Sequence, residues 1–350
     1  MEKLLADGRA YKMEKTSRDG KTGEVVMFRM PKEGTLAFDD IVKGHMEKKA
    51  EDVPDFAIVR SDGSPIFHLA NVVDDIDQRV THVIRGDDHV ENTFKHIELF
   101  KALGAEPPRY GHLSMIVNAQ GKPYSKRDGA AFVGEFRENG YLPEALFNYL
   151  LLLGWNPGDE REVLTRQEMV ELFEIEKVHV TAAKFDIKKL QWMNGEYIRR
   201  APREQFRAEL LARLGAAGLV PPPDFNLEML IDQLQIRTKF WNDIPGNCAW
   251  FFTEDYPIDE KAVEKRLKKP GVKELLLDLA DRFAKLEPFT AAAGEEMVKG
   301  LSQGQGMGPW VHPIRVAVSG RMEGPGLFEM LELLGRDRTV ARLTRAAVQL

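Results

Sequence analysis

A strand, a helix and a second strand follow one another in the first half of this chain. Residues 80–85 form a short, continuous apolar run without clean alternation, which is typical of a strand covered on both faces. Residues 93–103 have helical spacing and end at Gly104, and residues 113–117 return as a strand. This order predicts a right-handed parallel crossover, the unit from which nucleotide-binding α/β sheets are built.

The second half has a different character, because helical spacing dominates it after residue 142. Pro143 begins a helix that runs to residue 153, and Gly154 follows its end. Glycine- and proline-rich segments, including Pro221-Pro222-Pro223, separate the later helices. These are predicted over residues 166–173, 184–194, 203–214, 227–234, 261–268, 272–286, 326–334 and 339–347. The predicted fold class is therefore an α/β part followed by an all-α part.

Turn-forming residues divide the first 75 positions into a short helix and two hairpins. Residues 1–5 have helical spacing and stop at Asp7-Gly8. The polar, glycine-bearing residues 16–23 lie between two β-rich runs and predict a hairpin tip or a short insertion loop. Residues 56–60 and 66–73 are also β-rich, and the Ser-Asp-Gly-Ser-Pro between them predicts a second hairpin.

The first of the predicted crossover strands ends in a charged turn, Arg85-Gly86-Asp87-Asp88-His89. In an open parallel sheet, ligands bind beyond the carboxyl ends of the strands, where Arg85 lies. Its guanidinium matches a carboxylate, and Asp87 or Asp88 could accept hydrogen bonds from an amino group or a ribose hydroxyl. The alternative is that these charged groups simply pair with one another on the rim of the sheet.

A basic loop follows the second strand and suits a polyphosphate. It begins with the polar turn Asn118-Ala119-Gln120-Gly121 and contains Lys126 and Arg127. An ammonium against the α-phosphate of ATP would stabilise the charge that grows when a carboxylate attacks and pyrophosphate leaves. An exposed basic loop without function is the alternative. The chain has no Walker motif, which disfavours a P-loop NTPase. The charged turn at residues 85–89 and this basic loop together indicate an enzyme that activates a carboxylate with ATP.

The composition is that of a soluble globular protein, with 43% hydrophobic and 30% charged residues. The single cysteine, Cys248, excludes an internal disulfide and a thiolate-based metal site within the chain. We expect a buried, small hydrophobic role for Cys248 and a reducing cytoplasm as the location. No run of 18 apolar residues and no signal-peptide pattern occurs, so neither a membrane span nor export is predicted.

Charge is distributed unevenly along the chain. The formal net charge is −6, but residues 299–350 carry seven basic and four acidic side chains. A basic C-terminal segment is typical of a nucleic-acid-binding face, and equally of a solvated helix surface. An aromatic cluster before it could stack bases, but we expect core packing for its members, Trp241, Trp250, Phe251, Phe252 and Tyr256.

Three ordered motifs resemble those of bacterial glutamyl-tRNA synthetases. They are His68-Leu69-Ala70-Asn71-Val72-Val73-Asp74-Asp75, then Thr81-His82-Val83-Ile84-Arg85-Gly86-Asp87-Asp88-His89, then Tyr124-Ser125-Lys126-Arg127-Asp128-Gly129-Ala130. The similarity continues through residues 140–155, 184–194 and 313–335 and so covers essentially the whole chain.

The resemblance implies a partial class I Rossmann-like catalytic domain over residues 1–135, a stem-contact region over 136–200 and a helical anticodon-binding domain over 201–350. It implies that ATP, with Mg²⁺, activates L-glutamate and that the glutamyl group is transferred to tRNA(Glu). The expected form is a cytoplasmic monomer.

The resemblance also assigns roles to individual residues. The expected glutamate-binding residues are Phe67, His68, Asn71, Arg85, Asp87 and His89. The expected ATP-binding residues are Asp88, Ile116, Pro123, Tyr124, Ser125, Lys126 and Arg127, with Lys126 as the catalytic lysine. Arg85 and Lys126 are expected to converge on one crevice. The tRNA would be contacted by arginines of the C-terminal segment, namely Arg315, Arg336, Arg338, Arg342 and Arg345.

The chain departs from the family pattern at several positions. Pro123 occupies the usual lysine position of the signature loop, and Phe67 replaces a frequent tyrosine. Residues 12–26 hold no cysteine where many relatives carry a zinc knob, so no zinc is expected. The first signature motif of the family is absent, which predicts little activity for the chain alone and an exposed sheet edge with poor solubility.

Two functions remain open from the sequence: a glutamate-tRNA ligase, and a tRNA-binding remnant without catalysis. The truncated homologue that glutamylates a modified tRNA base is disfavoured, because it lacks a helical domain like the one predicted here. A glutaminyl-specific enzyme is disfavoured because its C-terminal half is a β-barrel.

Overall fold

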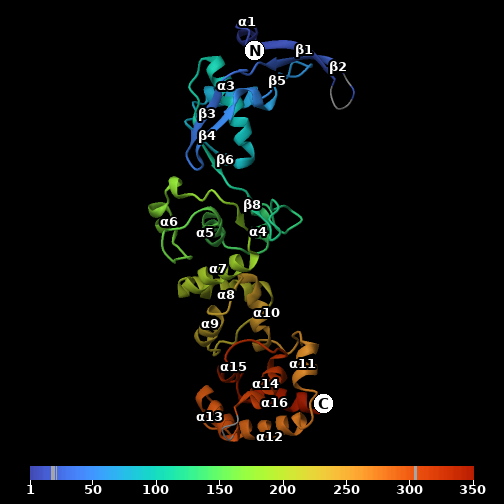
Figure 1. Cartoon of the computed structure of the whole chain (residues 1–350). Coiled ribbons are helices and arrows are strands. Elements are labelled where there is room, and N and C mark those ends of the chain that lie inside the picture. Colours follow the sequence, from blue (N-terminus) through green and yellow to red (C-terminus); the bar gives the residue numbers. More distant parts are fainter. Residues whose placement is uncertain (17–19, 21, 303–305) are drawn as a thin grey trace. The chain divides into compact units, whose positions relative to one another are not determined.

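The predicted strand, helix and strand are present in a four-stranded sheet. Strand β6 (His82–Gly86) leads through helix α3 (Val90–Leu103) to strand β7 (Arg109–Leu113), and the two strands pair in parallel. Gly104 ends α3 in the left-handed conformation, with φ of 81°. A parallel crossover is therefore present, but its second strand covers residues 109–113 and shares only Leu113 with the predicted strand over 113–117. Strand β6 and helix α3 are labelled in Figure 1.

The computed structural model describes residues 1–16, 20, 22–302 and 306–350. The chain folds as two compact units. The first unit contains residues 1–133 and 146–187, and the second contains residues 134–145 and 188–350. These units differ from the three-part division predicted from the sequence, which stays a prediction.

A hairpin that the sequence did not reveal completes the four-stranded sheet. Strands β3 (Thr35–Asp40) and β4 (Gly44–Lys49) pair antiparallel, and β3 pairs in parallel with β7 through Asp40 and Tyr110. The strand order is β4-β3-β7-β6, so β6 forms one edge of the sheet. Ile84 on this edge strand is 42% exposed. The solubility expected from such an edge stays a prediction.

A three-stranded sheet lies at the start of the chain, after helix α1 (Glu2–Ala6). Strands β1 (Ala10–Thr16) and β2 (Thr22–Phe28) form the first predicted hairpin, and β5 (Phe56–Val59) pairs with β2. Half of the predicted tip, residues 17–19 and 21, lies outside the described residues. Within the described part, the first hairpin is confirmed.

The second predicted hairpin is wrong. After β5 the chain forms helix α2 (Phe67–Asp77) instead of a strand. Leu69 and Val72 are spaced to share one helix face, and that buried face packs in the core of the first unit. The β-branched and aromatic residues of this segment favoured a strand, but burial of one helical face outweighed that local preference.

The predicted strand over residues 113–117 is divided in two. Strand β7 ends at Leu113, and β8 (Ile116–Val117) pairs in parallel with β9 (Ala183–Lys184) in a separate two-stranded sheet. The remaining helices of this region are α4 (Val133–Glu138), α5 (Pro143–Gly154) and α6 (Arg166–Leu172). Thr165 and Glu168 form a capping box at the start of α6.

The second unit is helical, as predicted. Its helices are α7 (Ile187–Arg200), α8 (Arg203–Ala216), α9 (Leu227–Gln235), α10 (Ile244–Cys248), α11 (Glu260–Arg266), α12 (Val272–Ala284), α13 (Ala291–Ser302), α14 (Gly308–Ser319), α15 (Leu327–Leu334) and α16 (Arg336–Val348). The sequence analysis missed α10, α13 and α14, which are interrupted by glycine or proline. Short 3₁₀ turns occur at Ala50–Asp52, Asp87–His89, Ile175–Lys177, Trp241–Asp243 and Ala249–Phe251.

The aromatic cluster lies in the core of the second unit. Trp241, Trp250 and Phe251 are buried, and Phe252 and Tyr256 pack against them. Cys248 is fully buried, and burial raises the pKa of its thiol to about 12. The predictions of core packing and of an inert, buried cysteine are confirmed.

None of the helices described is both long enough and apolar enough to cross a lipid bilayer.

Candidate functional site

Arg85 lies at the carboxyl end of β6 and is held from several sides. It donates from Nε to Nε2 of His112 at 3.2 Å, and from one terminal nitrogen to Oγ1 of Thr93 at 2.7 Å and to the His89 carbonyl at 3.3 Å. The guanidinium also lies over the ring of Tyr110, 5.4 Å from its centroid. These contacts give a half-buried cation a fixed orientation.

A buried pair, Asp40 and His112, supports Arg85 from behind. Nδ1 of His112 lies 2.5 Å from Oδ2 of Asp40, and both side chains are fully buried. Because Nε2 of His112 accepts from Arg85, its proton is on Nδ1 and is donated to Asp40. Burial lowers the pKa of His112, so the imidazole is neutral. The imidazole therefore links the carboxylate to the guanidinium in one defined tautomer.

Asp40 is ionised in spite of its burial. Burial alone would raise its pKa, but the hydrogen bond from His112 and backbone amides outweigh this effect and lower the pKa. The amides that donate to Asp40 belong to Val42 and Lys43, each at 2.9 Å, and to His112 at 3.1 Å. The amides at the turn between β3 and β4 thus stabilise the charge that orients His112.

Arg85 has no carboxylate partner of its own among the described residues. No acidic oxygen of these residues lies within 4.0 Å of its guanidinium, although the negative charges of Asp75 and Asp88 favour its charged form. Burial lowers the pKa of Arg85, but a guanidinium stays cationic at neutral pH. A half-buried, pre-oriented guanidinium without a counter-ion has the geometry and charge to accept a carboxylate or a phosphate.

A wall of aromatic rings adjoins this cation. Phe67, His68, His89 and His96 pack ring against ring, and Nδ1 of His68 lies 3.0 Å from Nε2 of His96. Burial is the main reason why the pKa falls to about 4 for His68 and about 3 for His96. Nδ1 of His96 and the hydroxyl of Tyr110 are buried without a hydrogen-bond partner among described groups. Unsatisfied polar atoms near a free cation are typical of a ligand site.

The two aspartates of the charged turn have different surroundings. Asp87 pairs with Lys43 at 3.0 Å, whereas Asp88 is exposed and lies 3.7 Å from Nε2 of His89. Gly86 allows this arrangement, because an added Cβ would lie 2.6 Å from Oδ1 of Asp88. The prediction that these charges pair with Arg85 itself is not what the structure shows.

The basic loop is organised by hydrogen bonds among Asn118, Ser125 and Asp128, a role that the sequence analysis did not assign to them. Asn118 accepts from the amides of Gln120 and Lys122 and donates to Asp128 at 2.8 Å. Asp128 accepts from the amide and the hydroxyl of Ser125, each at 2.9 Å. The hydrogen bonds from Asn118 and Ser125 lower the pKa of Asp128, so the loop is fastened at its base by a carboxylate.

The fastened loop presents its cations to solvent. Lys126 and Arg127 are exposed, and Tyr124 packs on Phe185 with ring centroids 4.5 Å apart. Pro123 bridges to Val117, and the Tyr124 amide donates to the Ile116 carbonyl at 2.9 Å. No described contact joins Lys126 to Arg85, so their convergence on one crevice stays a prediction. Asn71, on α2, is half-buried and makes no side-chain hydrogen bond within the described part.

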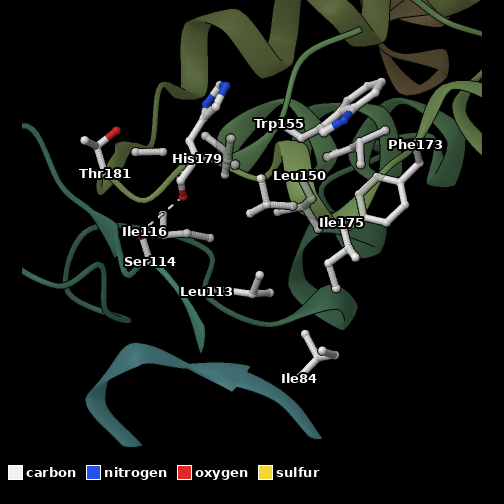
Figure 2. Close-up of a pocket in the computed structure, with 15 residues that line it drawn as sticks. Ile84, Leu113, Ser114, Ile116, Leu150, Trp155, Phe173, Ile175, His179 and Thr181 are labelled. Atoms are coloured by element: carbon white, nitrogen blue, oxygen red, sulfur yellow. Dashed lines mark hydrogen bonds between the residues drawn. The ribbon is translucent and has the colours of Figure 1, made fainter. Parts of the chain in front are cut away.

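An apolar pocket of about 270 Å³ lies beside Ile116 in the first unit (Figure 2). Ile84 and Leu113 line it together with Trp155 and Phe173. Side chains alternate along β6, so Ile84 and Arg85 point to opposite faces of the strand. The pocket and the Arg85 site are therefore two different hollows.

The arginines predicted to contact tRNA mostly have partners within the second unit. Arg336 donates to the Leu286 carbonyl and pairs with Glu287, while Arg338 and Arg345 pair with Glu254. Arg315 donates to the Pro325 carbonyl at 2.7 Å and is half-buried. Whether these four residues contact tRNA stays a prediction.

Arg342 is a correction to the sequence analysis. It is 1% exposed, pairs with Glu254 at 2.7 Å and donates to the carbonyls of Val318 and Trp250. Burial would raise the pKa of Glu254, but Arg342 and its neighbouring arginines lower it to about 2. Arg342 has no free donor at the surface, so its role is to hold α16 in the core.

No group of three potential metal ligands occurs among the described residues. Zinc was not expected from the sequence, and that expectation stays a prediction.

Two family models together match almost the whole chain. The model described as "tRNA synthetases class I (E and Q), catalytic domain" matches residues 1–192, and the model described as "Anticodon binding domain" matches residues 182–347.

Curated relatives and solved structures agree with these matches. The glutamate-tRNA ligase of Moorella thermoacetica is 39% identical over 92% of this chain and 67% of its own length. The ligase of Thermobifida fusca is 41% identical over 93% of this chain and 70% of its own. The crystal structure of a glutamate tRNA ligase from Elizabethkingia meningosepticum with its amino acid has a TM-score of 0.77 at 29% identity. The similarity covers 100% of this chain and 70% of that one.

Proposed function

Because the chain belongs to the class I tRNA synthetases of the glutamate and glutamine group, we infer that it is a glutamate-tRNA ligase chain. The proposed reaction has two steps. A carboxylate oxygen of L-glutamate attacks the α-phosphorus of ATP, and pyrophosphate leaves. The terminal ribose hydroxyl of tRNA(Glu) then attacks the glutamyl carbonyl, and AMP leaves.

The observation that carries the amino-acid part of the proposal is the unpaired guanidinium of Arg85. Its orientation is set by His112 and Thr93, while a substrate carboxylate would supply the missing counter-ion. Phe67, His68 and His89 form the adjacent wall, and Asn71 and Asp87 belong to the same two motifs. His68 is neutral at pH 7 because burial lowers its pKa to about 4, so this ring does not compete with Arg85 for a bound carboxylate.

The nucleotide part of the proposal rests on the fastened loop. Lys126 would stabilise the charge that develops on the α-phosphate, and Arg127 would add a second cation. Ile116 and the loop residues Pro123, Tyr124 and Ser125 would contact the nucleotide, with Asp88 on its ribose or amino group. Mg²⁺ would arrive bound to the phosphates of ATP, since this ion commonly keeps substrate phosphates and waters as ligands.

The tRNA part of the proposal rests on the helical second unit, which carries the anticodon-binding match. Arg315, Arg336, Arg338 and Arg345 are the proposed contacts from the sequence, and Arg342 is left out because it is buried. We propose a monomer that acts in the cytoplasm, with stem-contact and anticodon-binding regions at the boundaries predicted above.

Glutamate-dependent exchange of pyrophosphate into ATP tests the ligase proposal. We expect weak exchange that requires L-glutamate, in line with the low activity predicted from the sequence, and at least a hundredfold loss of it in Arg85→Gln and in Lys126→Ala. Arg60→Gln and Lys49→Ala remove an exposed arginine and lysine of the same unit and serve as controls.

A filter-binding assay with tRNA(Glu) separates the two functions left open by the sequence. Binding of tRNA without any exchange would favour the non-catalytic remnant. Exchange that is independent of glutamate, or that survives both active-site substitutions, would overturn the ligase proposal.

A further inference from the structure

A basic hollow of about 630 Å³ lies in the second unit and is lined by residues from the end of α11 and the starts of α12 and α14. These three helices are labelled in Figure 1. The side chains that line it include Arg266, Lys269, Trp310 and His312. None of the arginines predicted from the sequence to contact tRNA lines it. Its volume lies within the range of about 300–1,000 Å³ that is usual for small-molecule sites.

The hollow carries positive charge without counter-ions. No acidic side chain lines it, and neither Arg266 nor Lys269 has a carboxylate partner among the described residues. Their neighbour Lys268 does pair with Glu264, so an available carboxylate on α11 is already engaged elsewhere. Nε of Arg266 is buried without a hydrogen-bond partner in the described part. Nε of Arg266 and the charges of Arg266 and Lys269 are therefore available to bind an anion.

His312 adds a neutral hydrogen-bonding group to the cations. Burial lowers its pKa, and the charges of Arg266, Arg315 and Lys269 lower it further. The starts of α12 and α14 have no side-chain cap, and their amides add partial positive charge. A phosphate group satisfies this combination of donors better than a carboxylate-bearing side chain, because it offers more acceptor oxygens.

Flat side chains beside the cations indicate that the ligand is larger than phosphate alone. Trp310 is half-buried and lines the hollow between Pro309 and Pro313. An indole next to basic side chains is the combination that stacks a splayed base while its phosphate is held. Single-stranded RNA fits both halves of the hollow, whereas an acidic peptide would use only the charges.

We propose that this hollow binds one unpaired nucleotide of RNA, with its phosphate on Arg266 and Lys269 and its base on Trp310. The proposal rests on the function proposed above, since it names a subsite for the tRNA partner. It adds a second contact surface to the one formed by the predicted arginines.

Fluorescence anisotropy with a labelled tRNA(Glu) transcript and the full chain tests this subsite. We expect R266Q/K269Q to raise Kd roughly tenfold and to reduce the salt dependence by about 0.7 for each phosphate that is no longer neutralised. We expect W310A to raise Kd roughly tenfold without changing the salt dependence, and W310F to bind within about twofold of the parent chain. K285Q/K299Q removes two exposed lysines of the same unit and controls for overall charge.

Quenching of tryptophan fluorescence by pentauridylate provides a second readout, with W310F as the blank for the other tryptophans. Quenching assigned to Trp310 without tRNA(Glu) binding would sink the ligase proposal and keep the nucleotide subsite. tRNA binding that R266Q/K269Q and the control pair weaken equally would overturn the subsite and keep the ligase proposal. If inorganic phosphate displaces pentauridylate and W310A does not change the Kd for tRNA(Glu), the hollow binds phosphate alone. This result would also overturn the proposal.

Discussion

Arg85 in the first unit and Arg342 in the second are both withdrawn from solvent, but their charges are neutralised differently. Arg342 is 1% exposed and has Glu254 and backbone carbonyls as partners. Arg85 is half-buried, and its hydrogen-bond partners among the described residues are His112, Thr93 and the His89 carbonyl, none of which is a carboxylate. A buried cation whose partners are complete stabilises the fold, whereas one that lacks a counter-ion is prepared for a ligand. The contrast supports a structural role for Arg342 and the ligand-binding role that we propose for Arg85.

The largest effect on stability is expected at Arg342. Arg342→Met would leave the Val318 and Trp250 carbonyls without their donor, which costs about 3 kcal/mol of unfolding free energy. Urea denaturation measures this loss. Arg345→Met removes an exposed partner of the same Glu254 and should cost less than about 1 kcal/mol. Equal losses in the two variants would remove the distinction between the arginines.

Substitution of Arg85 should affect glutamate-dependent exchange much more than the free energy of unfolding. Arg85→Met removes a desolvated charge without a counter-ion, so we expect a change in unfolding free energy of less than about 1 kcal/mol. Glutamate-dependent exchange should nevertheless fall about a hundredfold, because the carboxylate loses its partner. Arg85→Lys should not restore it, since an ammonium cannot reproduce the forked contacts to His112 and Thr93. Normal exchange in the lysine variant would contradict this explanation.

The buried pair behind Arg85 should act on substrate affinity through position. Asp40→Asn keeps the volume but removes the charge that orients His112, so we expect KM for glutamate to rise about tenfold with a smaller change in kcat. Asp39→Asn, at an exposed neighbour, is the matched control. If Asp40→Asn lowers both kcat and the melting temperature but leaves KM for glutamate unchanged, the role of Asp40 is in folding alone.

The smallest effects concern pH, and they fall in different windows for the two units. His68 and His96 have folded-state pKa values of about 4 and about 3, below the unfolded value of about 6.5. The unfolded chain therefore binds their protons first, and stability should fall as the pH drops from about 6.5 towards 4. Glu254 has a folded-state pKa of about 2, so its contribution is present above about pH 4.5 and is lost below it.

Unfolding free energies of the parent chain and two variants would check these windows. His96→Gln should flatten the pH dependence between about pH 6.5 and 4, and Glu254→Gln should flatten it only below about pH 4.5. A single acid transition that neither substitution changes would show that other groups control acid stability.

Much of the fold was predictable because it is encoded by local spacing. The crossover from β6 through α3 to β7 and most helices of the second unit follow from periodicity and from end signals such as Gly104. Residues 66–73 were predicted wrongly because their strand preference was outweighed by packing of one helical face in the core. The sequence analysis missed the β3–β4 hairpin, and the pairing of β3 with β7 joins Asp40 to Tyr110, which is far along the chain.

The candidate site was predictable only in its local motifs. Arg85, Asp88 and Lys126 were singled out because each lies in a short charged segment after a predicted strand, and their roles stay predictions. Asp40 and His112 were missed, since they are 72 residues apart and neither looks unusual in its own segment. Asn118 and Asp128 lie in the predicted loop, but their hydrogen bond depends on how the loop folds back.

The parallel crossover, the helical second half and the resemblance to glutamyl-tRNA synthetases follow from the amino-acid sequence alone, because periodicity and short motifs are local properties. Which cations are neutralised within the protein depends instead on tertiary packing. Arg85 and Arg342 are the same residue type, but Arg85 donates to the neutral His112 whereas Arg342 pairs with the carboxylate of Glu254. Burial and counter-ions come from segments distant in the chain, so folding determines whether a charge is available for a ligand.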